Sequence, residues 1–400
     1  MKRQQEWTWT RRKFGKMAAM MGAAAAMPRW LRGEQSASAV PDVMGADSLR
    51  AHADARGLLI GAAVVPKLLD VDGLAAGNTT DGYTLLVKNQ ANILVAENAM
   101  KWGALRPSQG VFDFTQADKL MRFASLAGQK VRGHNLCWHE GNPAWLKSAA
   151  TKENARLLLT EHIRTVARHY RGRLHSWDVV NEAIELKDKQ PDGLRKSLWY
   201  DLIGPEYLEL AFRTAAAADP DAKLTYNDYG FELDTPDGTA KREQVLALVR
   251  RLKDRGAGIH AVGVQSHLPA DGPLPGAGLI AFIREMGKMG LEVYITELDV
   301  NTVKIAGGNA EQDAAVARVY REFPALVLAE PNVKALLTWG ITDAHTWLNE
   351  MQRPWAERPD GSRQRPLPFD ADLKPTPAFF ALRDAIETAA RRKRDQSVVH

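Results

Sequence analysis

Short apolar segments alternate with amphipathic helical patterns along most of this 400-residue chain. Eight of the segments are mostly continuous apolar runs rich in β-branched residues, which is typical of strands covered on both faces of a sheet. These predicted strands are Leu58–Val65, Ile93–Met100, Lys130–Trp138, Ser176–Glu182, Lys223–Gly230, Ala261–Leu268, Glu292–Asp299 and Val333–Gly340. Strands that alternate with helices predict a parallel sheet, because each helix returns the chain to the start of the next strand.

Helical patterns fill most of the intervals between these strands. The predicted helices are Thr115–Gln129, Glu153–Arg173, Pro205–Ala218, Thr239–Arg255, Leu279–Met289, Gln312–Leu328 and Thr376–Arg391. Repeated strand–helix units of this number predict the α/β fold class and a (β/α)8 barrel in a single domain, residues 45–390. A doubly wound open sheet is disfavoured, because Gly61–Val64 lacks the glycine-rich phosphate-binding pattern expected after the first strand of such a sheet.

Polar, charged or aromatic side chains stand at the ends of seven of the eight predicted strands. They are Glu97, Asn98, Lys101 and Trp102; His134, Trp138 and His139; Asn181 and Glu182; Asn227, Asp228 and Tyr229; Gln265 and His267; Glu297 and Asp299; and Trp339. The carboxyl ends of all strands in a barrel meet at one face, and that face carries the active site. The sequence therefore predicts a single polar cleft.

Two carboxylic acids of this set, Glu182 and Glu297, end the fourth and seventh strands. Paired acids across a cleft suit hydrolysis of a glycosidic bond, in which one protonates the leaving oxygen and the other attacks as a carboxylate. Their surroundings must then separate their pKa values. Aromatic residues that could stack on sugar rings are Trp102, Trp138, Trp339 and Trp347.

Two functions from other classes compete with this interpretation, a metal-dependent hydrolase and a sugar-binding protein on an inactive barrel. Candidate metal ligands are His134, His139, His267, Asp343 and His345. No two neighbouring candidates have a spacing typical of zinc motifs such as H-E-x-x-H, so neither a metal nor another cofactor is expected. An inactive barrel is disfavoured because both acids are present.

The strand ends closely resemble those of family 10 glycoside hydrolases, and the matching stretches follow one another in the family order. They are Glu97–Trp102, Gly133–His139, Trp177–Glu182, Asn227–Tyr229, Gly263–Leu268, Ile295–Asp299 and Trp339–Trp347. The resemblance implies an endo-1,4-β-xylanase that cleaves internal bonds of xylan with retention of configuration through a covalent glycosyl-enzyme. Xylan or xylo-oligosaccharides would be its partners. A retaining hydrolase of cellulose or mannan is the alternative, since one small substituent changes discrimination by only about 1–3 kcal/mol.

The same resemblance implies roles for individual residues. Glu182 would be the general acid/base and Glu297 the nucleophile, oriented by His267, while Asn181 would hold the 2-hydroxyl of the sugar. The predicted substrate-binding residues are Glu97, Asn98, Lys101, His134, Trp138, Asn181, Tyr229, Gln265, His267, Trp339 and Trp347.

One departure from the family pattern follows Trp138–His139. Many members have a small residue and then a Gln that contacts substrate, whereas this chain has Glu140 and Gly141. Hydrogen bonding at that subsite is therefore expected to differ.

The N-terminus resembles a twin-arginine export signal, residues 1–39. It combines Arg11–Arg12, an apolar stretch Met17–Met27 and the small residues Ala37–Ala39. An apolar helix of this length spans roughly 16 Å of the bilayer's roughly 30 Å core, so no stable membrane anchor is expected. The sequence predicts a periplasmic or secreted protein, with the twin-arginine machinery as a partner of the precursor.

The charge and the cysteine content limit which other partners and sites the chain is expected to have. Residues 1–39 hold eight of the 53 Lys and Arg and two of the 48 Asp and Glu, which leaves 45 basic and 46 acidic residues. Because positive and negative charges nearly balance, there is no reason to expect nucleic acid as a partner. The protein is expected to be a monomer. Residues 391–400 are interpreted as a solvated basic tail. The single cysteine, Cys137, excludes an intramolecular disulfide and a cysteine-based zinc site.

Overall fold

The computed structural model describes residues 43–350 and 354–392. The predicted export signal, residues 1–39, and most of the predicted basic tail lie outside the described residues. The prediction of a solvated tail is wrong for Arg392, which is buried and donates to the backbone oxygens of Val333 at 2.6 Å and Leu328 at 3.0 Å. Among the described residues, no helix is both long and apolar enough to cross a bilayer.

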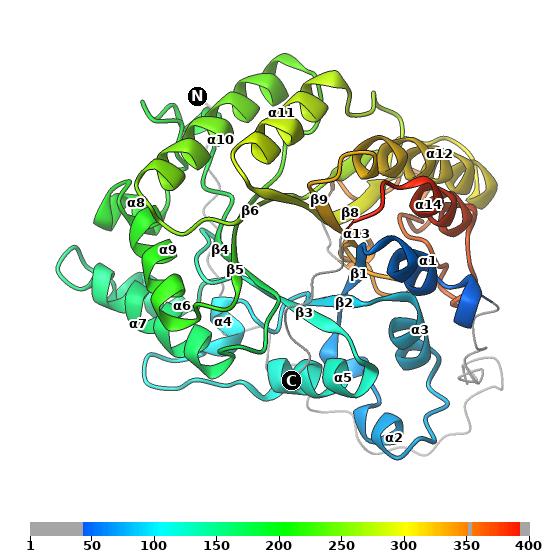
Figure 1. The fold of residues 1–400 in the computed structure, drawn as a ribbon, viewed down its shortest axis with the longest axis horizontal. Helices are drawn as coiled ribbons and strands as arrows, with labels where there is room; N and C mark the ends of the chain where they lie inside the picture. Colours follow the sequence, from blue (N-terminus) through cyan, green and yellow to red (C-terminus); the bar gives the residue numbers. More distant parts are fainter. Residues whose placement is uncertain (1–42, 351–353, 393–400) are drawn as a thin grey trace. The chain divides into compact units, whose positions relative to one another are not determined.

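Eight parallel strands within the described residues close into a barrel, which confirms the predicted fold class (Figure 1). They are β1 (Leu59–Val64), β2 (Ile93–Ala96), β3 (Lys130–His134), β4 (Ser176–Asn181), β5 (Lys223–Asp228), β6 (Ala261–Val264), β8 (Glu292–Asn301) and β9 (Val333–Thr338). Neighbours in this order pair in parallel, and β1 pairs with both β2 and β9, which closes the ring. All eight predicted strands are present.

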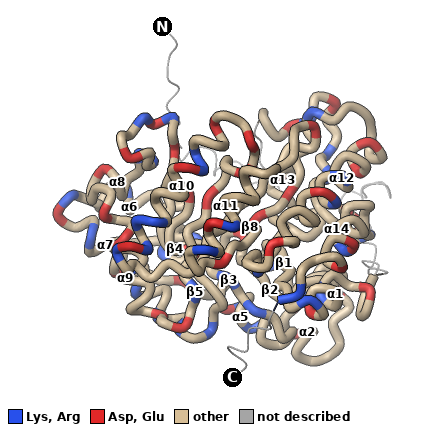
Figure 2. Tube along the Cα trace, turned by 45° about the horizontal axis from the view of Figure 1, so that its top comes forward, with Lys and Arg blue, Asp and Glu red and all other residues tan. Residues whose placement is uncertain are grey.

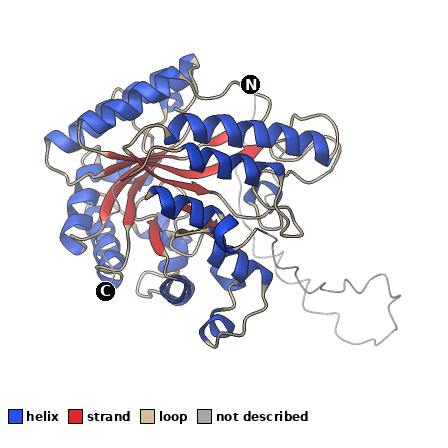
Figure 3. Ribbon diagram, turned by 45° about the vertical axis from the view of Figure 1, so that its right-hand side comes forward, coloured by secondary structure: helices blue, strands red, loops and turns tan. Residues whose placement is uncertain are grey.

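Helices surround the strands on the outside of the barrel (Figure 3). The longer ones are α1 (Leu49–Arg56), α3 (Gly82–Gln90), α5 (Thr115–Ala127), α7 (Ala155–His169), α9 (Tyr207–Ala218), α10 (Pro236–Asp254), α11 (Ala277–Lys288), α12 (Asn309–Leu328) and α14 (Pro377–Thr388). The short ones are α2 (Val71–Ala75), α4 (Trp102–Leu105), α6 (Ala144–Ala149), α8 (Leu198–Ile203) and α13 (Trp347–Glu350), with 3-10 turns at Gly45–Asp47, Pro66–Leu68 and Leu186–Asp188. The seven predicted helices are all present.

The helix α3 between β1 and β2 was not predicted, because its buried face includes polar residues that break the apolar stripe. Thr84 and Gln90 are both buried. The Gln90 side chain accepts a hydrogen bond from the backbone N–H of Leu49 at 2.9 Å and donates one to the backbone oxygen of Val43 at 2.5 Å. Gln90 therefore fixes the segment that enters the barrel, while the Thr84 hydroxyl accepts from the backbone N–H of Asp70 at 2.8 Å.

The predicted strand Ala261–Leu268 is in fact two strands. β6 ends at Val264, Ser266 has a positive φ of 65°, and a short strand β7 (His267–Pro269) pairs with β8 instead. The backbone break shifts the register with β8 by one residue and sets His267 opposite Asp299. If β6 continued in its register with β8, His267 would lie opposite Leu298 and not opposite Asp299.

The inner and outer layers of the barrel are packed differently. An outer core fills the space between strands and helices, while a smaller apolar cluster that includes Ile93, Val95, Leu337 and Trp339 lies on the other face of the strands. Close packing explains Gly61 in β1, since a Cβ there would lie 1.8 Å from the backbone oxygen of Ile93. Basic and acidic residues are interspersed along the backbone tube in the view of Figure 2, without a long stretch of one sign.

Candidate active site

The carboxyl ends of the strands open into one pocket of about 1000 Å³. Each of the thirteen residues predicted as catalytic or substrate-binding lines this pocket: Glu97, Asn98, Lys101, His134, Trp138, Asn181, Glu182, Tyr229, Gln265, His267, Glu297, Trp339 and Trp347. The prediction of a stacking role for Trp102 is wrong. Its ring is 2% exposed and stacks on His162, with ring centroids 3.7 Å apart.

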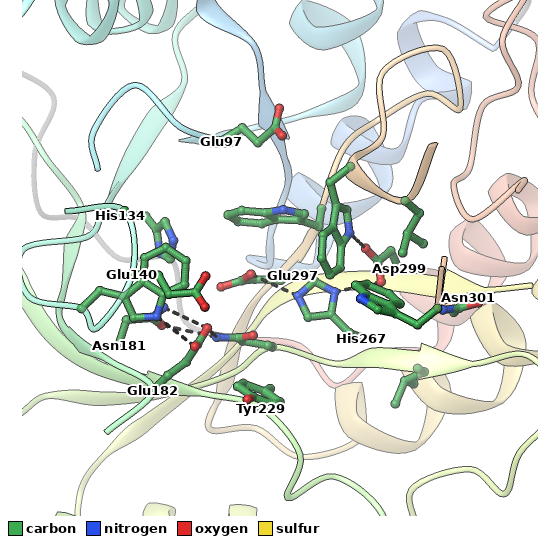
Figure 4. A pocket seen from close by; sticks show the side chains of 18 of the residues that line it. Glu97, His134, Glu140, Asn181, Glu182, Tyr229, His267, Glu297, Asp299 and Asn301 are labelled. Atoms are coloured by element: carbon green, nitrogen blue, oxygen red, sulfur yellow. Dashed lines mark hydrogen bonds and ion pairs between the residues drawn. The ribbon is translucent and has the colours of Figure 1, made fainter. Parts of the chain in front are cut away.

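Glu297 on β8 is buried at the floor of the pocket, and two side chains hold its carboxylate, of which His267 is drawn in Figure 4. Asn227 donates a hydrogen bond to Oε1 at 2.8 Å, and Nε2 of His267 lies 3.3 Å from Oε2. The other ring nitrogen of His267 lies 2.8 Å from Oδ1 of Asp299, whose second oxygen accepts the indole N–H of Trp347 at 2.6 Å. A chain of contacts thus runs from Trp347 to the Glu297 carboxylate.

This chain of contacts sets the charges on both His267 and Glu297. Burial lowers the pKa of His267, but the Asp299 and Glu297 carboxylates outweigh it and hold the pKa well above its usual value. Burial raises the pKa of Glu297, but the hydrogen bond from His267 and the nearby charges of His134, His267 and Arg132 lower it to about 2. Glu297 is therefore a carboxylate, and His267 an imidazolium, across the range in which most enzymes work.

Glu182 follows β4 and has a left-handed backbone conformation, with φ of 57°. Such a conformation costs a non-glycine residue about 1–3 kcal/mol, so the surroundings must impose it. The backbone N–H of Glu182 donates to the backbone oxygen of Asn227 at 2.8 Å, and Nε of Arg195 donates to the backbone oxygen of Glu182 at 2.8 Å. These contacts hold the turn that directs the Glu182 side chain into the pocket.

The carboxyl group of Glu182 is surrounded by neutral donors. Asn181 and Gln265 donate to Oε1 at 3.1 and 3.0 Å, and the indole of Trp138 donates to Oε2 at 2.9 Å. Nδ1 of His139 lies 3.7 Å from the same oxygen. Glu182 and Glu297 therefore have clearly different environments, amide and indole donors around the first and an imidazolium beside the second.

Amide side chains connect the two acids. Nδ2 of Asn227 lies 2.8 Å from Oδ1 of Asn181 and 2.8 Å from Oε1 of Glu297, while Asn181 donates to Glu182. The Asn227 oxygen accepts the hydroxyl of Thr296 at 2.7 Å, which fixes the orientation of its amide. Asn227 was among the polar strand-end residues of the predicted cleft, but no catalytic or binding role was predicted for it.

One wall of the pocket carries Lys101, whose ammonium donates to Asn98 at 2.8 Å and lies 5.2 Å from the ring centroid of Trp138. Burial lowers the pKa of Lys101, against the raising effect of nearby carboxylates. Burial also disfavours the charged form of Glu97 and therefore raises its pKa. Hydrogen bonds that involve a charged group are stronger than those between neutral groups, so Lys101 and Glu97 are suited to bind sugar hydroxyls.

His134 lies at the floor of the pocket, and the buried carboxylate of Asp178 holds its ring. Its Nδ1 is 2.7 Å from Oδ2 of Asp178, whose other oxygen accepts a hydrogen bond from Arg132. Both Asp178 and Arg132 are fully buried. Asp178 therefore holds the side chains of His134 and Arg132 in place.

The opposite wall carries Tyr229, whose ring is packed against Lys241 with the ammonium 4.2 Å from the ring centroid. Nη2 of Arg195 donates to its hydroxyl at 3.2 Å. Arg195 also lines the pocket and was not predicted, because it comes from the loop after β4 and from no strand end. Within the described part of the chain, no three His, Cys, Asp or Glu side chains are placed to hold a metal ion.

Comparison with known proteins identifies the family. The family model for glycosyl hydrolase family 10 matches residues 48–385. The chain belongs to glycosyl hydrolase family 10. It is thus a glycoside hydrolase, as the strand ends had indicated.

Relatives of this family 10 protein include a β-1,4-xylanase of Dictyoglomus thermophilum, 38% identical over 308 residues that cover 75% of this chain and 83% of the relative. Endo-1,4-β-xylanase B of Thermotoga neapolitana is 33% identical over 80% of this chain and 90% of its own length. Among solved structures, native xylanase 10B from Thermotoga maritima superimposes with a TM-score of 0.74 at 34% identity, covering 85% of this chain and 98% of that one. Xylanase 10B from Thermotoga petrophila RKU-1, solved in complex with xylobiose, has a TM-score of 0.74 at 33% identity and covers 85% and 97%.

Proposed function

We propose that this protein is an endo-1,4-β-xylanase that hydrolyses internal β-1,4-xylosidic bonds with retention of configuration. The observation that carries the proposal is the pair of acids in one pocket, an ionised Glu297 bound by His267 and a Glu182 surrounded by neutral donors. The xylanase names of the relatives support xylan as the substrate. Activity on cellulose or mannan remains the alternative.

In the first step, the Glu297 carboxylate attacks the anomeric carbon while Glu182 gives its proton to the leaving oxygen. A covalent bond forms between Glu297 and the sugar, and the glycosidic bond breaks. In the second step, Glu182 takes a proton from water, and that water attacks the anomeric carbon and releases Glu297. Two inversions at the same carbon give net retention.

The other pocket residues bind and position the sugar in this proposal. Asn181, held by Asn227, contacts the 2-hydroxyl beside the scissile bond. Glu97, Asn98 and Lys101 bind sugars on the non-reducing side. The aromatic rings of Trp138, Trp339 and Trp347, with His134, enclose the sugar at the cleavage point, while Tyr229 and Gln265 complete the binding surface.

The experiment that tests this function is reducing-sugar release, with chromatography of the products, from xylan, carboxymethylcellulose and mannan. The full chain should release xylo-oligosaccharides from xylan. Activity mainly on another polymer would retain the mechanism and contradict the substrate. Release of α-configured products, followed by NMR during hydrolysis, would contradict retention.

Replacing His267 with Gln should move the acidic limb of the kcat/KM profile to higher pH. The nucleophile must be ionised, and its pKa of about 2 depends on the His267 cation. Without that cation, burial still raises the pKa of Glu297, so protonation begins at higher pH, by about one to three units. The measurement is kcat/KM against pH on a soluble xylan.

The matched control is His52→Gln on α1, where the histidine pairs with Glu387 at 3.0 Å and does not line the pocket. This variant should keep the acidic limb of the full chain. An unchanged limb in His267→Gln would contradict the role given to His267.

We further propose that residues 1–39 direct export by the twin-arginine route, to the periplasm or beyond. Replacing both Arg11 and Arg12 with Lys keeps the charge and should leave the precursor in the cytoplasm. Cell fractionation followed by a xylanase assay measures the result. Normal export of the Lys–Lys variant would contradict this route.

A further inference from the structure

A third carboxylate, that of Glu140, points into the pocket beside the two proposed catalytic acids (Figure 4). Glu140 lies in the loop after β3, at the place where the sequence departs from the family pattern. The mechanism proposed above gives it no role. Its side chain is about half exposed, at 57%, so a substrate in the pocket can reach it.

The backbone of this loop favours glycine at the next position, where a side chain would be crowded. Gly141 has a φ of 65°, a conformation that favours glycine, and a Cβ there would lie 3.2 Å from the ring of Trp138. Its carbonyl accepts a hydrogen bond from the backbone of Gly103 at 2.7 Å. Glu140 is therefore the carboxylate that this loop presents to the pocket, next to His139.

Glu140 adds negative charge where the pocket already has an excess of it. The carboxylates of Glu297, Glu97, Glu182 and Glu140 all act on the single ammonium of Lys101. His139 lies between two of these groups, 3.6 Å from Glu140 and 3.7 Å from Glu182.

The excess extends over the whole pocket. Of the described residues that line it, seven are Asp or Glu and three are Lys or Arg. The His267 imidazolium adds a positive charge, which Glu297 and Asp299 already contact. Among the Lys and Arg residues, Arg195 lies 3.5 Å from Glu185 and Lys304 lies 3.6 Å from Asp271. An anionic group on the substrate would therefore meet repulsion near Glu140.

A carboxylate also differs from an amide in the hydrogen bonds that it makes. It only accepts them, whereas an amide both donates and accepts. Free hydroxyls of a neutral sugar chain can donate to Glu140. The carboxylate of a uronate side group offers no proton at neutral pH and brings a second negative charge into a partly desolvated site, where charge interactions are stronger than in water.

We propose that Glu140 makes the pocket selective for neutral stretches of xylan and against stretches that carry uronic-acid side groups. This inference rests on the proposed function and names the kind of xylan that the same site prefers. Glu140 acts as a specificity-determining residue, separate from the two acids that perform the chemistry.

The test compares kcat/KM on a neutral linear xylan and on a xylan with glucuronic-acid side groups, for the full chain and for Glu140→Gln. The full chain should prefer the neutral polymer. Glu140→Gln should raise the ratio of kcat/KM on the charged polymer to that on the neutral one on the order of fivefold, mainly through KM. Added NaCl should narrow the preference of the full chain, because salt screens charges about 10 Å apart at 0.1 M.

Two further variants separate charge at this position from general effects. Glu140→Asp keeps the carboxylate and should retain most of the preference of the full chain. Glu322→Gln removes one charge from an exposed position on α12, outside the pocket, and should leave the ratio unchanged.

The outcomes distinguish this inference from the proposed function. A ratio that stays the same in Glu140→Gln, or a full chain that hydrolyses both polymers equally well, would overturn the role of Glu140 alone. A full chain that hydrolyses neither xylan would overturn the proposed function and this inference with it.

Discussion

Replacing Glu297 with Ala should lower kcat/KM on xylan by roughly 10⁵-fold, because it removes the group that forms the covalent intermediate. The binding residues on both walls remain, so binding of xylo-oligosaccharides should survive and can be measured by calorimetry. Azide should restore turnover of an activated aryl glycoside, since a small anion fits the space left by the carboxylate. Because azide would enter from the side of Glu297, the product should be the α-glycosyl azide.

A suitable control is Glu292→Ala, which removes an acid from the other end of β8. Glu292 pairs with Lys223 at 2.7 Å and does not line the pocket. This variant should keep its turnover, whatever it loses in stability. Polymer hydrolysis by Glu297→Ala at the level of the full chain, or a β-glycosyl azide from it, would refute the nucleophile assignment.

Much of the site could be predicted from the sequence because of one geometric rule. Parallel strands in a barrel bring their carboxyl ends together, so Glu182 and Glu297 meet although 115 positions separate them in the chain. The strands themselves could be recognised because buried parallel strands are continuously apolar. With these two facts, polar residues at strand ends become candidate site residues without further information.

What could not be predicted depends on the exact path of the backbone. Arg195 reaches the pocket from a loop, and only the closed fold brings its guanidinium to the backbone oxygen of Glu182. Trp102 follows Lys101 directly, yet the short helix α4 turns its ring inward against His162. The apolar run at Ala261–Leu268 gave no sign of the break at Ser266, because the residues on both sides of it are suited to strands.

The break at Ser266 has a chemical consequence that the sequence pattern does not contain. β7 carries His267 to Asp299 on β8, and Asp299 raises the pKa of His267. The resulting cation keeps Glu297 ionised in spite of its burial. A local departure from regular strand geometry thus separates the environments of the two acids.

Replacing Glu182 with Ala should reduce activity according to the leaving group. A natural xylosyl leaving group needs a proton as the bond breaks, so kcat/KM on xylan should fall about 10²–10⁴-fold. An aryl glycoside with a strongly acidic phenol needs little protonation, and its first step should be almost unaffected. Its glycosyl-enzyme should then accumulate, because no base remains to activate water, and the assay should show a burst of phenol. Azide should speed the second step and give the β-glycosyl azide, since it attacks from the side opposite Glu297.

The control here is Glu206→Ala, which removes an exposed carboxylate just before α9, outside the pocket, and should behave like the full chain on both substrates. The product configurations make the two acid assignments mutually dependent. If Glu182 and Glu297 have the roles proposed, their Ala variants must give azides of opposite configuration, and no exchange of the two roles reproduces that pair of results. An equal loss of activity on xylan and on the activated aryl glycoside would contradict the acid role of Glu182, because a side chain needed only for binding or packing would not distinguish leaving groups.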